Sequence, residues 1–134
     1  MLSFIGDYTC KPDSKGRVVV PAVFRKEMQA VGEVSFVMRR NIFDECIDVY
    51  PKDEWLKLIA GLREKLSQFN REQVRFFREF FRGAQEVELD GIEVVGDIVM
   101  VGQDSKIEIW GKIKYEESAM DTDEFVLLTS QIGL

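Results

Sequence analysis

Apolar and polar residues alternate along the first fifty positions in the way that is typical of short strands. Residues 4–9 carry a strand pattern, and residues 34–38 and 47–49 alternate apolar positions with polar or small ones. Residues 41–45 have the composition of a turn between the second and third of these segments. The pattern therefore predicts a first strand and, later in the chain, a β-hairpin.

A tight turn, a β-branched segment and a helix are predicted between the first strand and the hairpin. Residues 12–16 combine Pro, Asp, Ser and Gly, which favour a reversal of the chain. Residues 18–20 are three valines, which favour a buried strand. Pro21 suits the first position of a helix, and Phe24 and Met28 would lie on one face of that helix.

The apolar positions take on a helical period from residue 53. Asn70 has the chemistry of a helix N-cap and Gln73 that of its capping-box partner, so residues 53–82 predict two helices joined near residues 69–70. We expect the aromatic residues of this pair to pack in the core or between subunits, because aromatic side chains mainly supply buried area. The two apolar stripes consist of Trp55, Leu58, Ile59, Leu62 and Leu66, followed by Val74, Phe77 and Phe81.

Strand patterns return after Gly83, at residues 87–89, 98–100 and 107–109. The tail from Asp121 onwards mixes acidic residues with the apolar residues 125–128. The pattern leaves two alternatives open for this tail, a short packed element or a mobile segment.

The two halves of the chain resemble each other. The segment Ile47–Tyr50 matches Ile107–Trp110, and Asp13 matches Asp90, but the second half reaches its hairpin without the β-branched segment and the helix. We therefore expect one domain over residues 1–134, made of a first repeat at 4–52, a helical hairpin at 53–82, a truncated second repeat at 83–118 and a tail at 119–134. The second repeat would lack a packing helix, so a neighbouring subunit or the tail should cover its apolar face. Two such halves predict an α+β fold of interlocked hairpins around a small β-barrel.

Composition excludes several classes of function. The 134 residues contain no histidine, which removes the commonest general base and metal ligand. Phosphate-binding glycine loops and the regular acidic spacing of a calcium loop are missing from the sequence. We therefore expect no catalytic residues, no metal, no cofactor and no small-molecule substrate.

The same composition indicates where the protein works. We find no apolar run long enough to span a membrane and no signal-peptide pattern at residues 1–8, so we expect neither a membrane segment nor secretion. Cys10 and Cys46 lie far apart and have no metal-type spacing, which favours a reducing cytoplasm.

Charge is unevenly distributed along the chain. Residues 1–82 hold 15 basic and 12 acidic residues and residues 83–134 hold 3 and 12, which together give the net charge of −6. The local field of a folded protein, rather than its net charge, decides which partners it attracts. A basic first half could face DNA, although ordinary solvated charge explains the same counts.

The run Asp13-Ser14-Lys15-Gly16-Arg17, followed by Pro21, resembles the Asp-x-x-x-Arg signature of the MraZ family. Tyr50-Pro51 before Trp55, and the segment from Val101 to Trp110, sit where members of that family carry similar residues. The resemblance covers nearly the whole chain and extends to the wider AbrB-like swapped-hairpin group.

This resemblance implies a double-split β-barrel built from swapped hairpins, with the helical hairpin between the two halves. It implies a sequence-specific transcriptional regulator, cytoplasmic and nucleoid-associated, that binds direct repeats of double-stranded DNA in the promoter of a division and cell-wall gene cluster. It also implies ring-shaped homo-oligomers. The family pattern has two Asp-x-x-x-Arg motifs, whereas the second motif of this chain keeps Asp90 without its arginine and proline.

Arg17 is the principal candidate for DNA contact, because a guanidinium offers a planar fork of donors to phosphate or to a guanine edge. Lys15 would add a phosphate contact, and Asp13, Gly16 and Pro21 would order the motif. The alternative for Asp13 and Arg17 is an ordinary ion pair across the turn. The basic residues expected to extend the patch are Arg25, Arg39 and Arg40.

A second function remains open from the sequence. AbrB-like folds also serve as antitoxin-like partners, and the acidic second half with its incomplete motif would suit a protein partner with a basic face. DNA affinity and its dependence on salt would separate this protein-interaction module from the regulator.

Overall fold

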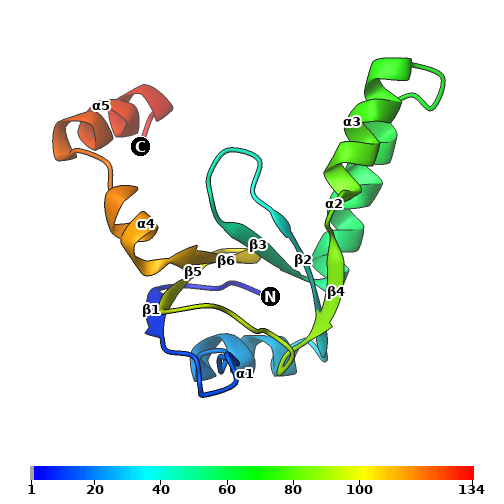
Figure 1. Ribbon diagram of the computed structural model, residues 1–134. Coiled ribbons are helices and arrows are strands. Elements are labelled where there is room, and N and C mark those ends of the chain that lie inside the picture. Colours follow the sequence, from blue (N-terminus) through cyan, green and yellow to red (C-terminus); the bar gives the residue numbers. More distant parts are fainter. Residues whose placement is uncertain (1) are drawn as a thin grey trace.

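A computed structural model describes residues 2–134 and has an α+β fold, as the sequence predicted. A curved antiparallel sheet of six strands lies at the centre, with one helix beneath it and two helical arms above its flanks (Figure 1). The order of the strands across the sheet is β1-β5-β6-β3-β2-β4. The strands are β1 (Asp7–Cys10), β2 (Ser35–Arg40), β3 (Ile47–Pro51), β4 (Gln85–Glu88), β5 (Ile98–Gln103) and β6 (Lys106–Gly111).

Five helices complete the described chain. The helical pair expected over residues 53–82 is present as α2 and α3, and the residues after β6 form two further helices. None of the helices in residues 2–134 combines the length and the apolar character of a membrane-spanning segment. The helices are α1 (Ala22–Ala30), α2 (Lys52–Lys65), α3 (Arg71–Phe81), α4 (Lys112–Glu117) and α5 (Thr122–Ile132).

The two halves of the chain exchange their edge strands. β2 pairs with β3 and β5 with β6 as hairpins, while β1 pairs with β5 of the second half and β4 pairs with β2 of the first half. The hairpins meet where β3 pairs with β6, in a register that sets Asp48 opposite Glu108. Each half is therefore held in the sheet by strands of the other half.

The expected closed barrel is not formed, because β1 and β4 end the described sheet as unpaired edges. Residues 17–18 and 92–94, which approach one another below the sheet, make only an isolated bridge between Arg17 and Glu93. A longer ladder between these segments is limited by the residues that flank them. Pro21 follows the first segment and lacks a backbone N–H donor, and the second segment is bounded by Gly91 and Gly96. The prediction of a strand at residues 18–20 is wrong for the same reason.

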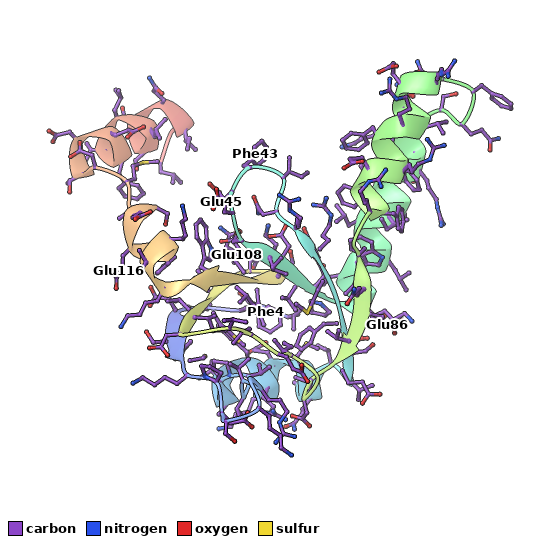
Figure 2. All side chains as sticks on the ribbon, in the orientation of Figure 1. Phe4, Phe43, Glu45, Glu86, Glu108 and Glu116 are labelled. Atoms are coloured by element: carbon purple, nitrogen blue, oxygen red, sulfur yellow. The ribbon has the colours of Figure 1, made fainter. Side chains whose placement is uncertain are left out.

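Helix α1 covers the apolar face of the sheet. Phe24 and Met28, which the sequence placed on one helical face, are fully buried, whereas Val31 lies largely exposed beyond the helix. Their partners come from both halves and include Phe36 on β2 and Met100 on β5. Figure 2 shows Phe4 on this side of the sheet, above α1.

The truncated second repeat is filled from within the chain. Residues 90–97 form no helix, as expected, but Ile92 is buried beside α1 and closes the core there. The tail does not cover this face, because α5 buries none of its residues and stands away from the sheet (Figure 1). The expectation that the tail covers this face is therefore wrong, since the curved sheet wraps one helix with strands of both halves. Cover by a neighbouring subunit stays a prediction.

The helical pair packs on the opposite face of the sheet, over β2. Val37 contacts Trp55 and Phe80, whose rings stack at a centroid distance of 5.6 Å. Asn70 caps α3 by accepting a hydrogen bond from the backbone N–H of Gln73, as the sequence predicted. The expected capping box is not formed, because the Gln73 side chain accepts a hydrogen bond from the backbone N–H of Ser67 rather than from that of Asn70.

A buried ion network lies on the same face, where β3 meets β6. The Lys106 ammonium is 2.9 Å from an Asp48 carboxylate oxygen and 3.7 Å from a Glu108 carboxylate oxygen. The Asn41 amide donates to Asp48 at 2.9 Å, and the Trp110 indole N–H donates to Glu108 at 3.0 Å. Figure 2 shows Glu108 on the side of the sheet away from α1.

Lys106 remains charged in this setting. Burial lowers the pKa of Lys106, but the hydrogen bond to Asp48 and the surrounding negative charges outweigh it, so the pKa is raised. A raised pKa means that the network contributes its full stabilisation below the ordinary lysine pKa of about 10.4. That contribution is lost as the pH rises through the raised value.

Lys106→Met is expected to lower the free energy of unfolding by about 3–5 kcal/mol, because it leaves two facing buried carboxylates without their cation. Urea unfolding at neutral pH measures the change. Lys57→Met, at a side chain that is 74% exposed, should change the stability by less than about 0.5 kcal/mol. Adding Asp48→Asn and Glu108→Gln to Lys106→Met should recover most of the loss, and an unaltered stability of the single variant would contradict the assignment.

Candidate nucleic-acid interface

The segment between β1 and α1 folds into a turn that Asp13 holds together. One Asp13 carboxylate oxygen accepts hydrogen bonds from the backbone N–H groups of Lys15 and Arg17, both at 2.9 Å. The other oxygen accepts from Nε of the Arg17 guanidinium at 3.1 Å. The backbone N–H of Asp13 donates to the Arg17 carbonyl at 2.8 Å, so both ends of the turn are tied to each other.

These contacts keep the Asp13 carboxyl ionised. Hydrogen bonds from the backbone N–H groups of Arg17 and Lys15, together with the Arg17 guanidinium, hold the pKa of Asp13 below its ordinary value. A lowered pKa means that the carboxylate supports the turn above its ordinary pKa of about 3.9. That support is lost as the pH falls through the lowered value.

Gly16 is required at the tip of the turn for two reasons. Its φ of 81° lies in the left-handed region, which other residues adopt only with strain. A Cβ atom at this position would lie 3.0 Å from the Val94 carbonyl oxygen. The contact is close because the Val94 N–H donates to the Gly16 carbonyl at 2.7 Å, while the Val18 N–H donates to the Ile92 carbonyl at 3.1 Å.

The turn presents its basic side chains to solvent. The Arg17 side chain is 52% exposed and Lys15 is also exposed. Because the ion pair with Asp13 uses Nε, the two terminal guanidinium nitrogens of Arg17 remain available to a ligand. The ion pair that the sequence offered as one alternative for Asp13 and Arg17 is present, and it leaves an exposed fork of donors on Arg17. Contact of this fork with DNA stays a prediction.

Arg25 and Pro21 lie next to this turn. Pro21 caps α1, and its carbonyl accepts the backbone N–H of Arg25 at 3.0 Å. The Arg25 guanidinium pairs with Asp90 at 2.8 Å. Asp90, which the comparison of the two halves aligned with Asp13, is therefore bound to a helix of the first half.

Arg39 and Arg40 do not extend this patch. Arg39 is only 9% exposed, stacks 4.2 Å above the Phe80 ring and donates to the Phe80 carbonyl at 3.0 Å, so it anchors α3 to β2. Arg40 is exposed and lines a separate groove with Phe76 and Arg82 of the α3 segment. The prediction that both join Arg17 on one surface is wrong, because α3 folds against the end of β2 that lies away from the turn.

Among the described residues, one trio has the ligand types for a metal: Cys46, Asp48 and Glu108. The Lys106 ammonium already pairs with both carboxylates. Burial and the charges of Glu108 and Asp48 raise the pKa of the Cys46 thiol to about 12, so the thiol stays protonated at neutral pH. The trio is therefore better suited to holding β3 against β6 than to binding a metal.

The sequence did not indicate the support that residues 92–94 give to the turn. Their hydrogen bonds join positions more than seventy residues apart, and no local pattern marks them. The sequence also did not indicate the Lys106 network. A signal was present, because the alignment of the two halves matches Asp48 with Glu108, and these two acidic residues lie opposite each other on neighbouring strands. The sequence predicted the apolar stripes of the helical pair, but it did not predict the groove that apolar and basic residues line there together.

Comparison with known proteins gives a consistent result. The family model described as "MraZ protein, putative antitoxin-like" matches residues 3–78. A protein of Bacteroides thetaiotaomicron named transcriptional regulator MraZ is 34% identical, with 93% of this chain and 88% of the relative covered. Proteins of the same name from Clostridium acetobutylicum and Christiangramia forsetii are 33% and 32% identical over 98% of this chain, and 99% and 94% of those relatives are covered.

Gly16→Ala is expected to lower the free energy of unfolding by about 1–2 kcal/mol, because alanine is strained at this φ and its methyl group meets the Val94 carbonyl. Gly61→Ala is the matched control. Gly61 lies within α2 with no atom near the position of an added Cβ, so this change should raise the stability by roughly 0.5–1 kcal/mol. Thermal and urea unfolding measure both variants, and equal effects at the two glycines would disprove the special role of Gly16.

Proposed function

The chain belongs to the MraZ family, and we propose that it is a DNA-binding transcriptional regulator whose contact with double-stranded DNA is the turn Asp13–Arg17. The observation that carries the proposal is the exposed guanidinium of Arg17, oriented by Asp13 with its terminal nitrogens unused. The role is that of a binding protein rather than an enzyme, acting in the cytoplasm at the nucleoid.

Arg17 supplies the specific contact and Lys15 a contact with the backbone. A guanidinium can donate two parallel hydrogen bonds to a guanine edge or to a phosphate, whereas an ammonium acts as a point charge. Asp13 does not touch the DNA, because phosphate repels a carboxylate, and it serves to hold the turn. Arg25 adds little to the positive field at the turn, because it is paired with Asp90.

Each subunit offers one such turn, because the second motif lacks its arginine and Asp90 is paired with Arg25. We propose that a ring-shaped homo-oligomer of at least four subunits presents several turns to direct repeats in the promoter of a division and cell-wall gene cluster. Linked modules gain roughly 10²–10⁴ in apparent affinity over a single module, so repeated sites compensate for a small contact per subunit.

Arg17→Ala should weaken binding to promoter DNA by about 1–3 kcal/mol per site, because it removes the forked donor. Fluorescence anisotropy with the DNA upstream of the gene's own coding sequence measures the affinity across a salt series. Wild-type binding should weaken steeply as the salt concentration rises, because the release of counterions from the DNA is then less favourable. Arg75→Ala is the control, since Arg75 is an exposed α3 residue paired with Glu72 and lies far from the turn. Equal affinity of the wild type and Arg17→Ala, or affinity independent of salt, would instead favour the protein-interaction module.

Reducing the promoter repeats to one copy should lower the apparent affinity of the wild-type protein by roughly 10²-fold or more. The reason is that one oligomer can then engage only one turn. Anisotropy with probes of equal length, in which the remaining repeats are scrambled, measures the loss. An affinity that does not depend on the number of repeats would exclude binding through several turns at once.

A further inference from the structure

Helix α5 is an apolar helix without a partner in its own chain. None of its residues is buried, and Phe125, Val126 and Ile132 are 62%, 60% and 73% exposed. Isolated helices of this length are marginal in water, because packing against another surface supplies most helical stability. A contiguous apolar surface of this kind indicates a contact with another molecule.

The exposed end of α5 is also acidic. The Asp121 side chain caps the helix by accepting the N–H groups of Asp123 and Glu124, and these two acidic residues occupy its first turn. Residues 119–134 contain no basic residue. A matching surface would therefore combine apolar side chains with unpaired positive charge.

The helical pair has such a surface. An open groove of about 710 Å³ lies between the end of α2 and the start of α3. Arg63 and Arg78 flank it and make no ion pair with any residue in 2–134, unlike Arg75 and Arg82 nearby. Phe69, at the connection between the helices, is 89% exposed. The groove is lined by Arg63, Leu66, Ser67, Gln68, Phe69, Gln73, Val74, Phe77 and Arg78.

Helix α5 and the pair α2 and α3, whose residues line this groove, stand on opposite flanks of the sheet, with the β2–β3 loop between them (Figure 1). We propose that α5 of one copy docks into the helical-pair groove of a second copy, with Asp123 and Glu124 facing Arg63 and Arg78. The apolar residues of α5 then cover Phe69 and the apolar floor of the groove. Because the two surfaces differ, each added copy leaves one helix and one groove free, and the assembly grows head to tail until it closes.

Charge reversal tests this contact on the full chain without DNA, so its outcome is independent of the proposed DNA contact. Asp123→Lys with Glu124→Lys reverses the charge of the first turn of α5 and leaves the Asp121 cap in place. Arg63→Glu with Arg78→Glu reverses the charge at the edges of the groove. Sedimentation velocity should show that each doubly substituted protein assembles at least about tenfold more weakly than the wild type, since like charges then face one another.

An equimolar mixture of the two reversed proteins should assemble again. The basic helix of one protein fits the acidic groove of the other, and the remaining helix and groove keep their original charges. This rescue also shows that both proteins are folded. Glu116→Lys with Glu117→Lys, exposed on α4 and equal in charge change, is the control and should assemble like the wild type (Figure 2 shows Glu116).

Two results would overturn the proposal. One is unchanged assembly of both reversed proteins. The other is weaker assembly of either protein without recovery in the mixture, which would show that the charges do not face one another across the interface.

Discussion

The antiparallel pairing of β3 with β6 is the interaction on which the rest of the fold depends. It is the only ladder among the described strands that joins the two hairpins directly, and its register sets Asp48 against Glu108. Like charges placed opposite each other destabilise a sheet, and burial strengthens their repulsion. Lys106 reaches both carboxylates and offsets part of this repulsion. Asn41 donates to the Asp48 oxygen that Lys106 contacts, and Trp110 donates to the second Glu108 oxygen.

Once the hairpins are joined, the exchanged strands determine where the candidate DNA turn lies. β1 runs along β5, so the chain that follows it emerges beside residues 92–94 of the second half. These residues hydrogen-bond to Gly16 and Val18, and Asp90 neutralises Arg25. Residues 90–94 of the second half thus support the turn of the first half.

The fold also separates the surfaces that carry opposite charge. The turn and α1 lie below the sheet, while the basic helical pair and the acidic α5 rise from its two flanks (Figure 1). DNA contact and subunit contact can therefore use different faces of one subunit. The unequal distribution of charge along the sequence thus corresponds to separate charged surfaces in the fold. The net charge of −6 does not reveal this separation.

The sequence by itself determined the elements whose cause is local. The helices α2 and α3, the Asn70 cap and the Asp13 turn depend on residues at most a few positions apart, and all are found in the structure. The expected stripe of α3 is only partly right, because Phe80 rather than Phe81 is its buried residue. Only the tertiary structure decided that the sheet stays open, that Arg39 is buried under Phe80, and that Asp90 pairs with Arg25. The contacts of Arg39 with Phe80 and of Arg25 with Asp90 join residues that are 41 and 65 positions apart. The open sheet depends on strands from both halves. Local periodicity carries no information about such contacts, because they depend on how the whole chain turns back on itself.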